Sequence, residues 1–172
     1  MGTSRKVAII AFTISACWPL AMGWAACEER SLTVIGTSLM PRIADGAIVD
    51  AIVGVDCAFT PSRGNVVLFV NGAQTVPLAK VVAAESGDRW SVTDDGGILV
   101  NDAEIRNSAD IAYRLDAARA SMLRLYEAAY NGVIPPDSYL LLGERREGSL
   151  DSSQFGLVHR TDVIGKIERV HD

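Results

Sequence analysis

The amino-acid sequence predicts a mainly β domain with one inserted amphipathic helix, preceded by a single N-terminal transmembrane helix. Three observations lead to this fold class. Twenty consecutive residues near the N-terminus carry no charge. The rest of the chain consists largely of short apolar runs that end at Gly, Pro, Asp or Asn, which is typical of strands and turns. One stretch between 110 and 130 repeats its apolar residues at steps of three and four, as a helix does.

The uncharged segment runs from Val7 to Ala26, and as a helix it would span about 30 Å, the thickness of the hydrocarbon core of a bilayer. Arg5 and Lys6 precede it and Glu28 and Glu29 follow it, so the positive-inside rule places the N-terminus in the cytoplasm. We therefore expect residues 1–6 to be cytoplasmic, residues 7–26 to form the anchor, and residues 27–172 to form one exported domain.

Two alternatives for the N-terminus stay open. The basic start and the small residues Ala25 and Ala26 also fit a cleaved secretory signal. Cys27 is a candidate for lipidation, although Trp24 stands three residues before it, where a lipoprotein has a small aliphatic residue.

Composition excludes several classes of partner and cofactor. The chain has 172 residues, of which 49% are hydrophobic, so one domain can bury a core without a metal. The net charge of −5 and the lack of a Lys/Arg stripe argue against nucleic acid. His159 and His171 lie too far from other ligands to predict a metal site, and we expect no cofactor. Cys17 falls within the anchor, which leaves Cys27 and Cys57 as a possible disulfide pair.

Short apolar runs predict seven strands after the anchor. A hairpin turn is expected at 94–97, where two Asp residues precede two Gly residues that tolerate the positive φ of such turns. The expected strands are Ala47–Val53, Asn65–Val70, Leu78–Ala84, Trp90–Thr93, Ile98–Val100, Tyr139–Leu142 and Val163–Val170.

A helix is expected from Asp110 to Tyr130, and Asn131, Gly132 and Pro135 end it. It either packs on the sheet as core or caps a substrate site. Its apolar face would consist of Ile111, Leu115, Ala118, Met122, Leu125 and Ala129.

Ser38 and Lys80 are the candidate nucleophile and general base. Ser38 lies at a glycine-flanked bend, Gly36–Pro41, and a serine hydroxyl becomes a good nucleophile only when a base removes its proton. Lys80 lies within the apolar run Val76–Ala84, where burial would lower its pKa toward neutrality. An ordinary turn serine and a lysine that reaches water from a strand edge are the alternatives.

A charged loop rich in hydroxyl groups, Leu142–Gly156, lies between two expected strands, and a Ser or Asp in it would orient the lysine. A Ser38–His159–Asp151 triad is conceivable from the residue types, but the spacing gives it no support and it leaves Lys80 unexplained.

In this order, these features resemble the type I signal peptidases, serine-lysine peptidases that remove signal sequences outside the membrane. Gly36–Pro41 resembles the nucleophile box, and Pro77–Asp88 resembles the lysine box. Arg63–Phe69 is similar to the family's Arg-Gly-Asp strand, Gly143–Gly156 to the last box, and Gly165-Lys166 to the end of the domain.

The resemblance implies further roles. Ser149 would orient Lys80, and Asp151 would be the buried acid that supports the loop. Because Gly36 replaces a serine that some members use in the oxyanion hole, the hole would rest on the backbone N–H groups of Ser38 and a neighbouring residue such as Gly36. Other departures from the family pattern are Asn65 for Asp, Val81 for Arg, Glu144 for Asp, and Ser153 for an Arg that forms a salt bridge.

The implied activity is endoproteolysis through a Ser/Lys acyl-enzyme, with exported precursors that carry small residues before the cleavage site as substrates. The implied location is the bacterial inner membrane, with a single pass and the catalytic domain on the periplasmic side, in contact with the bilayer. We expect a monomer. The short chain and the Pro-Leu-x-Lys sequence before the lysine resemble the TraF-type branch, which matures pilin precursors for conjugation.

Two other functions remain possible at this stage. The chain could be an inactive, membrane-tethered assembly factor of a secretion or conjugation system, since Gly36, Val81 and Ser153 depart from the family. It could also be a self-cleaving Ser/Lys peptidase of the LexA kind, although the first thirty residues leave no space for a DNA-binding domain.

Overall fold

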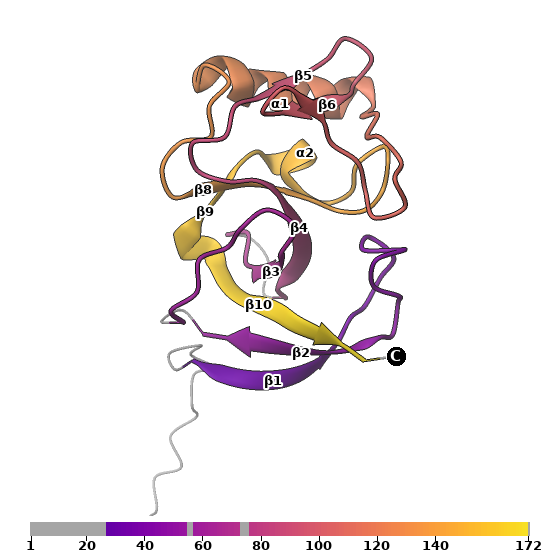
Figure 1. Cartoon of the computed structure of the whole chain (residues 1–172), viewed down its shortest axis with the longest axis vertical. Helices are drawn as coiled ribbons and strands as arrows, with labels where there is room; N and C mark the ends of the chain where they lie inside the picture. Colours follow the sequence, from indigo (N-terminus) through magenta and orange to yellow (C-terminus); the bar gives the residue numbers. More distant parts are fainter. Residues whose placement is uncertain (1–26, 55–56, 73–75, 172) are drawn as a thin grey trace, which may run out of the picture.

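The structure is a computed structural model that describes residues 27–54, 57–72 and 76–171. Two antiparallel sheets and two short helices form the domain (Figure 1). The expected anchor, residues 7–26, lies outside the described residues. Within the described residues, no helix has the length and apolarity needed to cross a membrane. The mainly β fold class expected from the sequence is confirmed for the described residues.

The larger sheet has seven strands in the order β1-β2-β10-β3-β4-β8-β9, and each neighbouring pair is antiparallel. Side chains of a strand point alternately to its two faces, and in β2 every second residue, Val49, Ala51 and Val53, is buried in the core. The shorter strands β3 and β8 are buried along their whole length. The strands are β1 Glu28–Thr33, β2 Ile48–Val53, β3 Val66–Phe69, β4 Leu78–Ala84, β8 Ser138–Leu142, β9 Val158–His159 and β10 Val163–Val170.

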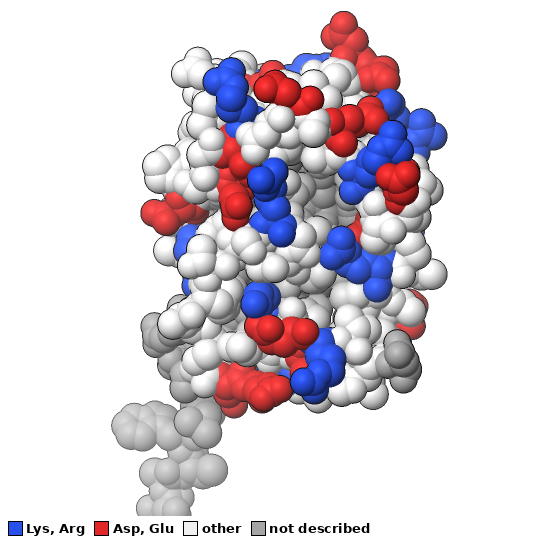
Figure 2. Space-filling view, viewed as in Figure 1, with Lys and Arg blue, Asp and Glu red and all other residues white. Residues whose placement is uncertain are grey.

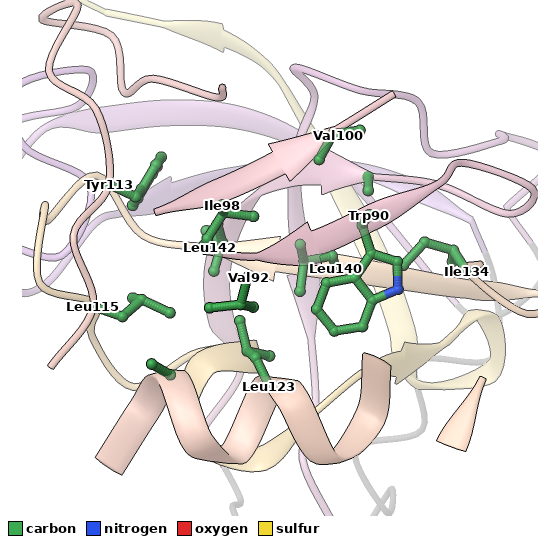
Figure 3. Close-up of a cluster of buried hydrophobic side chains, with 12 residues drawn as sticks. Trp90, Val92, Ile98, Val100, Tyr113, Leu115, Leu123, Ile134, Leu140 and Leu142 are labelled. Carbon is green, nitrogen blue, oxygen red and sulfur yellow. The ribbon is translucent and has the colours of Figure 1, made fainter. Parts of the chain in front are cut away.

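The smaller sheet packs with helix α1 at the end of the molecule opposite β1 and β2 (Figure 1). It consists of β5 Trp90–Val92, β6 Ile98–Val100 and β7 Ala103–Glu104. Figure 3 shows Trp90, Val92 and Ile98 of this sheet directed toward Leu123 of α1. The β5–β6 turn is the expected hairpin, in which Thr93 N–H donates to the Gly97 carbonyl and Gly96 has a φ of +80°.

Helix α1 spans Ala117–Ala129, so the expected start at Asp110 is wrong. Residues 111–115 are held extended by distant backbone partners, because Leu115 N–H donates to Gly96 and Arg114 N–H donates to Arg146. Asp116 then begins the helix by accepting a hydrogen bond from the Arg119 N–H at 2.9 Å.

The expected apolar face of the helix is also wrong. Ala118 and Leu125 are exposed, whereas Ala120 and Leu123 are buried against the smaller sheet. Leu115, one of the residues of the expected apolar face, belongs to the extended segment before the helix and packs into the same core cluster as Leu123.

All seven expected strands exist, and the bounds of β4, β6 and β10 agree at both ends. Three further strands, β1, β7 and β9, and the four-residue helix α2 Ser152–Phe155 were not expected. Their sequences lack an apolar run: β1 reads EERSLT and is largely exposed, and β7 and β9 have two residues each. Cys27, directly before β1, forms a disulfide with Cys57.

Candidate active site

Ser38 and Lys80 lie 42 residues apart in the chain but are hydrogen-bonded in the structure. Lys80 Nζ donates to Ser38 Oγ at 2.8 Å. Lys80 lies on β4, and Ser38 lies in the turn that follows β1. The fold therefore brings together the two residues that the sequence singled out.

Apolar side chains of the turn that carries Ser38 pack into the core and fix the turn in place. Leu39 and Ile43 are each 1% exposed and pack in a core cluster with Val49 of β2 and Val81 of β4. Within the turn, Ile43 N–H donates to the Leu39 carbonyl at 2.9 Å. An apolar residue directly after the serine thus fixes the turn and leaves the serine hydroxyl on the opposite side, facing Lys80.

Lys80 is 2% exposed, so its side chain does not reach water along the strand edge. Burial lowers the pKa of its ammonium below the ordinary value, and the negative charge of Asp151 partly opposes that effect. Besides Ser38, the amine contacts the Ala79 carbonyl at 2.9 Å. A neutral amine that touches a serine hydroxyl can take its proton.

An apolar pocket of about 430 Å³ opens beside the two residues. Both Ser38 and Lys80 line it, and no residue of α1 does, so the helix packs as core rather than as a cap on this pocket. The other lining residues come from β1 and the turn after it, from the start of β4, and from β2, β3 and β10: Leu32, Thr33, Val34, Ile35, Leu39, Val49, Leu68, Val76, Pro77, Leu78, Ala79 and Ile167.

Asp151 is completely buried and holds the loop after β8 together. Its carboxylate accepts five hydrogen bonds, from the backbone N–H groups of Gly143, Ser149 and Ser153 and from the hydroxyls of Ser149 and Ser153. The Ser149 hydroxyl therefore donates to Asp151 at 2.6 Å, and among the described residues no hydrogen bond joins it to Lys80.

The backbone around Gly36 limits the expected oxyanion hole. Gly36 N–H already donates to the Asp45 carboxylate at 2.8 Å, whereas the N–H of Ser38 has no partner among the described residues. Gly36 also has a φ of +98°, a backbone conformation that favours glycine and disfavours a serine at this position. Of the two amides expected for the hole, only that of Ser38 is free to receive an oxyanion.

Other candidate chemistry finds no support in the geometry. His159 Nδ1 contacts the Thr161 hydroxyl at 2.9 Å, and in the described part of the chain it makes no contact with Ser38 or Asp151. No group of three or more His, Cys, Asp or Glu side chains among the described residues could hold a metal ion.

Comparison with known proteins identifies the family of the chain. The family model described as "Signal peptidase, peptidase S26" matches residues 6–171, nearly the whole chain.

The chain belongs to the S26 signal peptidase family.

Curated relatives include signal peptidase IB of Staphylococcus aureus strain COL, which is 29% identical over 144 residues, 78% of this chain and 73% of the relative. The protein of strain Mu50 is 28% identical over the same shares. A crystal structure of a signal peptidase I from Enterococcus faecalis V583 matches with a TM-score of 0.45 and 19% identity, and covers 65% of this chain and 100% of that one. Family membership supports signal-peptide cleavage as the activity and serine endopeptidase as the enzyme class.

Three departures from the signal peptidase pattern have a structural counterpart. Ser153 stands for an arginine, and its hydroxyl and N–H both donate to Asp151. Glu144 is 2% exposed and pairs with Arg42 at 2.6 Å. Val81, which stands for the arginine after the lysine, lines one small cavity of about 210 Å³ together with Arg42 and Glu144. Arg42 therefore contributes a positive charge to the cavity that Val81 lines.

Arg42 and Glu144 also tie the nucleophile turn to the end of β8. Glu144 N–H donates to the Ser38 carbonyl at 2.7 Å, and its carboxylate accepts from the Ser108 N–H at 2.6 Å. Arg42 donates to the Gly64 carbonyl at 3.0 Å. The sequence did not single out Arg42 as functional, although its place directly after the nucleophile box is the signal that could have identified it.

Replacing Arg42 with Met is expected to lower the free energy of unfolding by about 2 kcal/mol, because the buried carboxylate of Glu144 loses its cation. Cleavage should slow as well, since the turn that carries Ser38 loses this tie. Urea unfolding and peptide cleavage assays measure the two effects. The double variant Arg42→Met/Glu144→Gln should recover part of the stability; a double variant no more stable than Arg42→Met alone contradicts the coupling.

Proposed function

We propose that this family member is a membrane-bound endopeptidase that cleaves signal or leader peptides from exported precursors, with Ser38 as nucleophile and Lys80 as general base. The observation that carries the proposal is the contact of 2.8 Å between Lys80 Nζ and Ser38 Oγ at the border of an apolar pocket. Burial of the amine favours its neutral form, which is the form that a general base needs.

The reaction is acyl transfer. Neutral Lys80 takes the proton of the Ser38 hydroxyl, and the oxygen attacks the carbonyl carbon of the scissile peptide bond. Lys80 then returns the proton to the leaving amine, and water resolves the acyl-enzyme by the same route. The carbonyl of Ala79 fixes the direction of the amine. The free N–H of Ser38 receives the developing oxyanion, a donor worth about 3 kcal/mol in comparable sites.

The substrate lies extended across the pocket between two unpaired strand edges. β1 is the outermost strand of its sheet, and β4 pairs with β8 only from Val81 onward, so the edge at Leu78–Lys80 is open. A peptide that adds to such edges gains main-chain hydrogen bonds, and its alternate side chains enter the pocket. The apolar lining favours small apolar side chains before the scissile bond.

The finer features of the function rest on sequence. The uncharged segment Val7–Ala26 serves as the anchor that holds the enzyme at the inner membrane, with its active site on the periplasmic side. The Pro77-Leu78-x-Lys80 sequence supports pilin precursors of a conjugation system as the substrates.

Cleavage is expected to increase as the pH rises through the pKa of Lys80, because only the neutral amine accepts the proton of Ser38. Burial lowers that pKa from its ordinary 10.5, so the inflection of kcat/KM should lie below this value. A kcat/KM profile measured with one precursor peptide checks the prediction. An inflection at or above 10.5, or a rate that falls as this group loses its proton, contradicts it.

The proposal is tested by incubating the full-length protein with a precursor carrying a small-x-small cleavage motif and identifying the products by mass spectrometry. We expect two fragments with one cut after a small residue, and none with Ser38→Ala. Ser86→Ala, which alters an exposed turn serine, is the matched control and should cleave normally. If the precursor stays intact with the unaltered protein, the inactive assembly factor is favoured; cleavage of the protein's own chain alone favours the LexA-like alternative.

A further inference from the structure

The loop after β8, residues 143–149, lies against the nucleophile turn but does not line the apolar pocket. Two contacts hold it there. Glu144 N–H donates to the Ser38 carbonyl at 2.7 Å, and the Arg145 guanidinium donates to the Thr37 hydroxyl at 2.7 Å. Arg145 is thus hydrogen-bonded to the residue directly before the nucleophile, and it does not line the pocket.

The side chain of Arg145 is exposed and has no acidic partner in the part of the chain that the structure describes. Most arginines of the described chain pair with a carboxylate, and Figure 2 shows basic and acidic side chains interspersed on the face in view. Among the described residues, no carboxylate pairs with Arg145 or with Arg146 beside it. Arg145 and Arg146 thus place positive charge beside the nucleophile turn of a chain whose net charge is −5.

The acids of the nucleophile turn and of the loop do not form ion pairs with Arg145 among the described residues, so its guanidinium can bind a carboxylate of another chain. Asp45 accepts the Gly36 N–H on the nucleophile turn, and Glu147 lies exposed further along the loop without an ion pair among the described residues. Thr37 engages one N–H of Arg145, and a guanidinium has five. The remaining donors match the fork of a carboxylate.

The loop of residues 143–149 lies near the expected position of the substrate residues that follow the scissile bond. In the proposed function, the residues before the scissile bond fill the apolar pocket. The residues after the bond would then continue past Ser38 away from the pocket. Residues 143–149 contact the nucleophile turn without lining the pocket, which would place Arg145 near the first residues of the mature protein.

We propose that Arg145 binds an acidic side chain at the second position after the scissile bond, so that the preferred precursors carry Asp or Glu there. The inference rests on the proposed function. By this inference the enzyme selects precursors also by the charge of a residue after the scissile bond, in addition to the size of the residues before it. Arg146 adds to the local positive charge.

The test uses three precursor peptides that differ only at the second position after the cleavage site, which is Asp, Asn or Lys. At low salt, kcat/KM for the Asp peptide should exceed that for the Asn peptide by about threefold and that for the Lys peptide by more, and the ratios should shrink in high salt. Arg145→Glu should reverse the order. Arg89→Glu is the matched control, because Arg89 is exposed and unpaired among the described residues but lies beside β5, away from the site; it should keep the order.

Equal kcat/KM values for the three peptides, or an order that survives Arg145→Glu, would overturn the inference while leaving the proposed function intact. If no peptide is cleaved, the proposed function fails and binding decides the inference. Labelled peptides are then titrated with the Ser38→Ala protein and followed by fluorescence anisotropy. Tighter binding of the Asp peptide that disappears in Ser38→Ala/Arg145→Glu supports the inference, and equal binding of all three peptides overturns it.

Discussion

Replacing Lys80 with Met is expected to lower kcat/KM for precursor cleavage by about a thousandfold or more, with the fold unchanged. General-base catalysis contributes about 10²–10⁴-fold, and a serine hydroxyl without a base is a poor nucleophile. Met has nearly the length of Lys without the amine, and because Lys80 is 2% exposed, the apolar replacement suits its surroundings. Cleavage kinetics and thermal unfolding of both proteins measure the two parts of the prediction.

Lys166→Met is the matched control, because Lys166 pairs with Glu168 on β10 and, among the described residues, has no hydrogen bond to Ser38. It should retain normal kcat/KM. Lys80→Arg should be as inactive as Lys80→Met, since a guanidinium stays charged and cannot take the serine proton. Activity within tenfold of the unaltered protein in Lys80→Met would exclude Lys80 as the base.

Replacing Asp151 with Ala is expected to lower the free energy of unfolding by about 3–5 kcal/mol. The substitution leaves the N–H groups of Gly143, Ser149 and Ser153 and two hydroxyls without their acceptor, in a place with no access to water. Cleavage should also fall steeply, because the loop that Asp151 holds is bonded to the Ser38 carbonyl through Glu144. Urea unfolding and peptide cleavage assays measure both effects.

Asp116→Ala is the control for Asp151. Like Asp151, which is the N-cap of α2, Asp116 is a helix N-cap, but its side chain is exposed. Its replacement should lower the free energy of unfolding by about 1 kcal/mol and have little effect on cleavage. Asp151→Asn gives a second measurement: the charge of Asp151 raises the pKa of Lys80, so its removal should move the inflection of the pH profile to lower pH. Equal stability losses at Asp116 and Asp151, or an inflection that moves upward, would contradict the assigned role.

The strands that agree best with the sequence are those with a continuous apolar run bounded by turn residues, such as β4 and β6. β1 was missed because its side chains are mostly charged or polar and exposed, and it is a strand only through its pairing with β2. Ile111 and Leu115 fit the period of the helix and predict a start before Ala117, yet the Leu115 N–H donates to the Gly96 carbonyl instead. In both cases the secondary structure is determined by backbone pairing with a distant segment and not by the local pattern of residues.

The sequence by itself determined the mainly β class and the candidate dyad Ser38 and Lys80, and the resemblance to signal peptidases implied the supporting role of Asp151. The two candidates of the dyad depend on local patterns, which are a serine before an apolar residue and a proline, and a lysine within an apolar run. Only the tertiary structure decided that Gly36 N–H is engaged by Asp45, that Ser149 donates to Asp151, and that Arg42 neutralises Glu144. Arg42 and Glu144 are 102 residues apart, and partners at such separations are set by strand register and turn geometry, which local residue patterns do not encode.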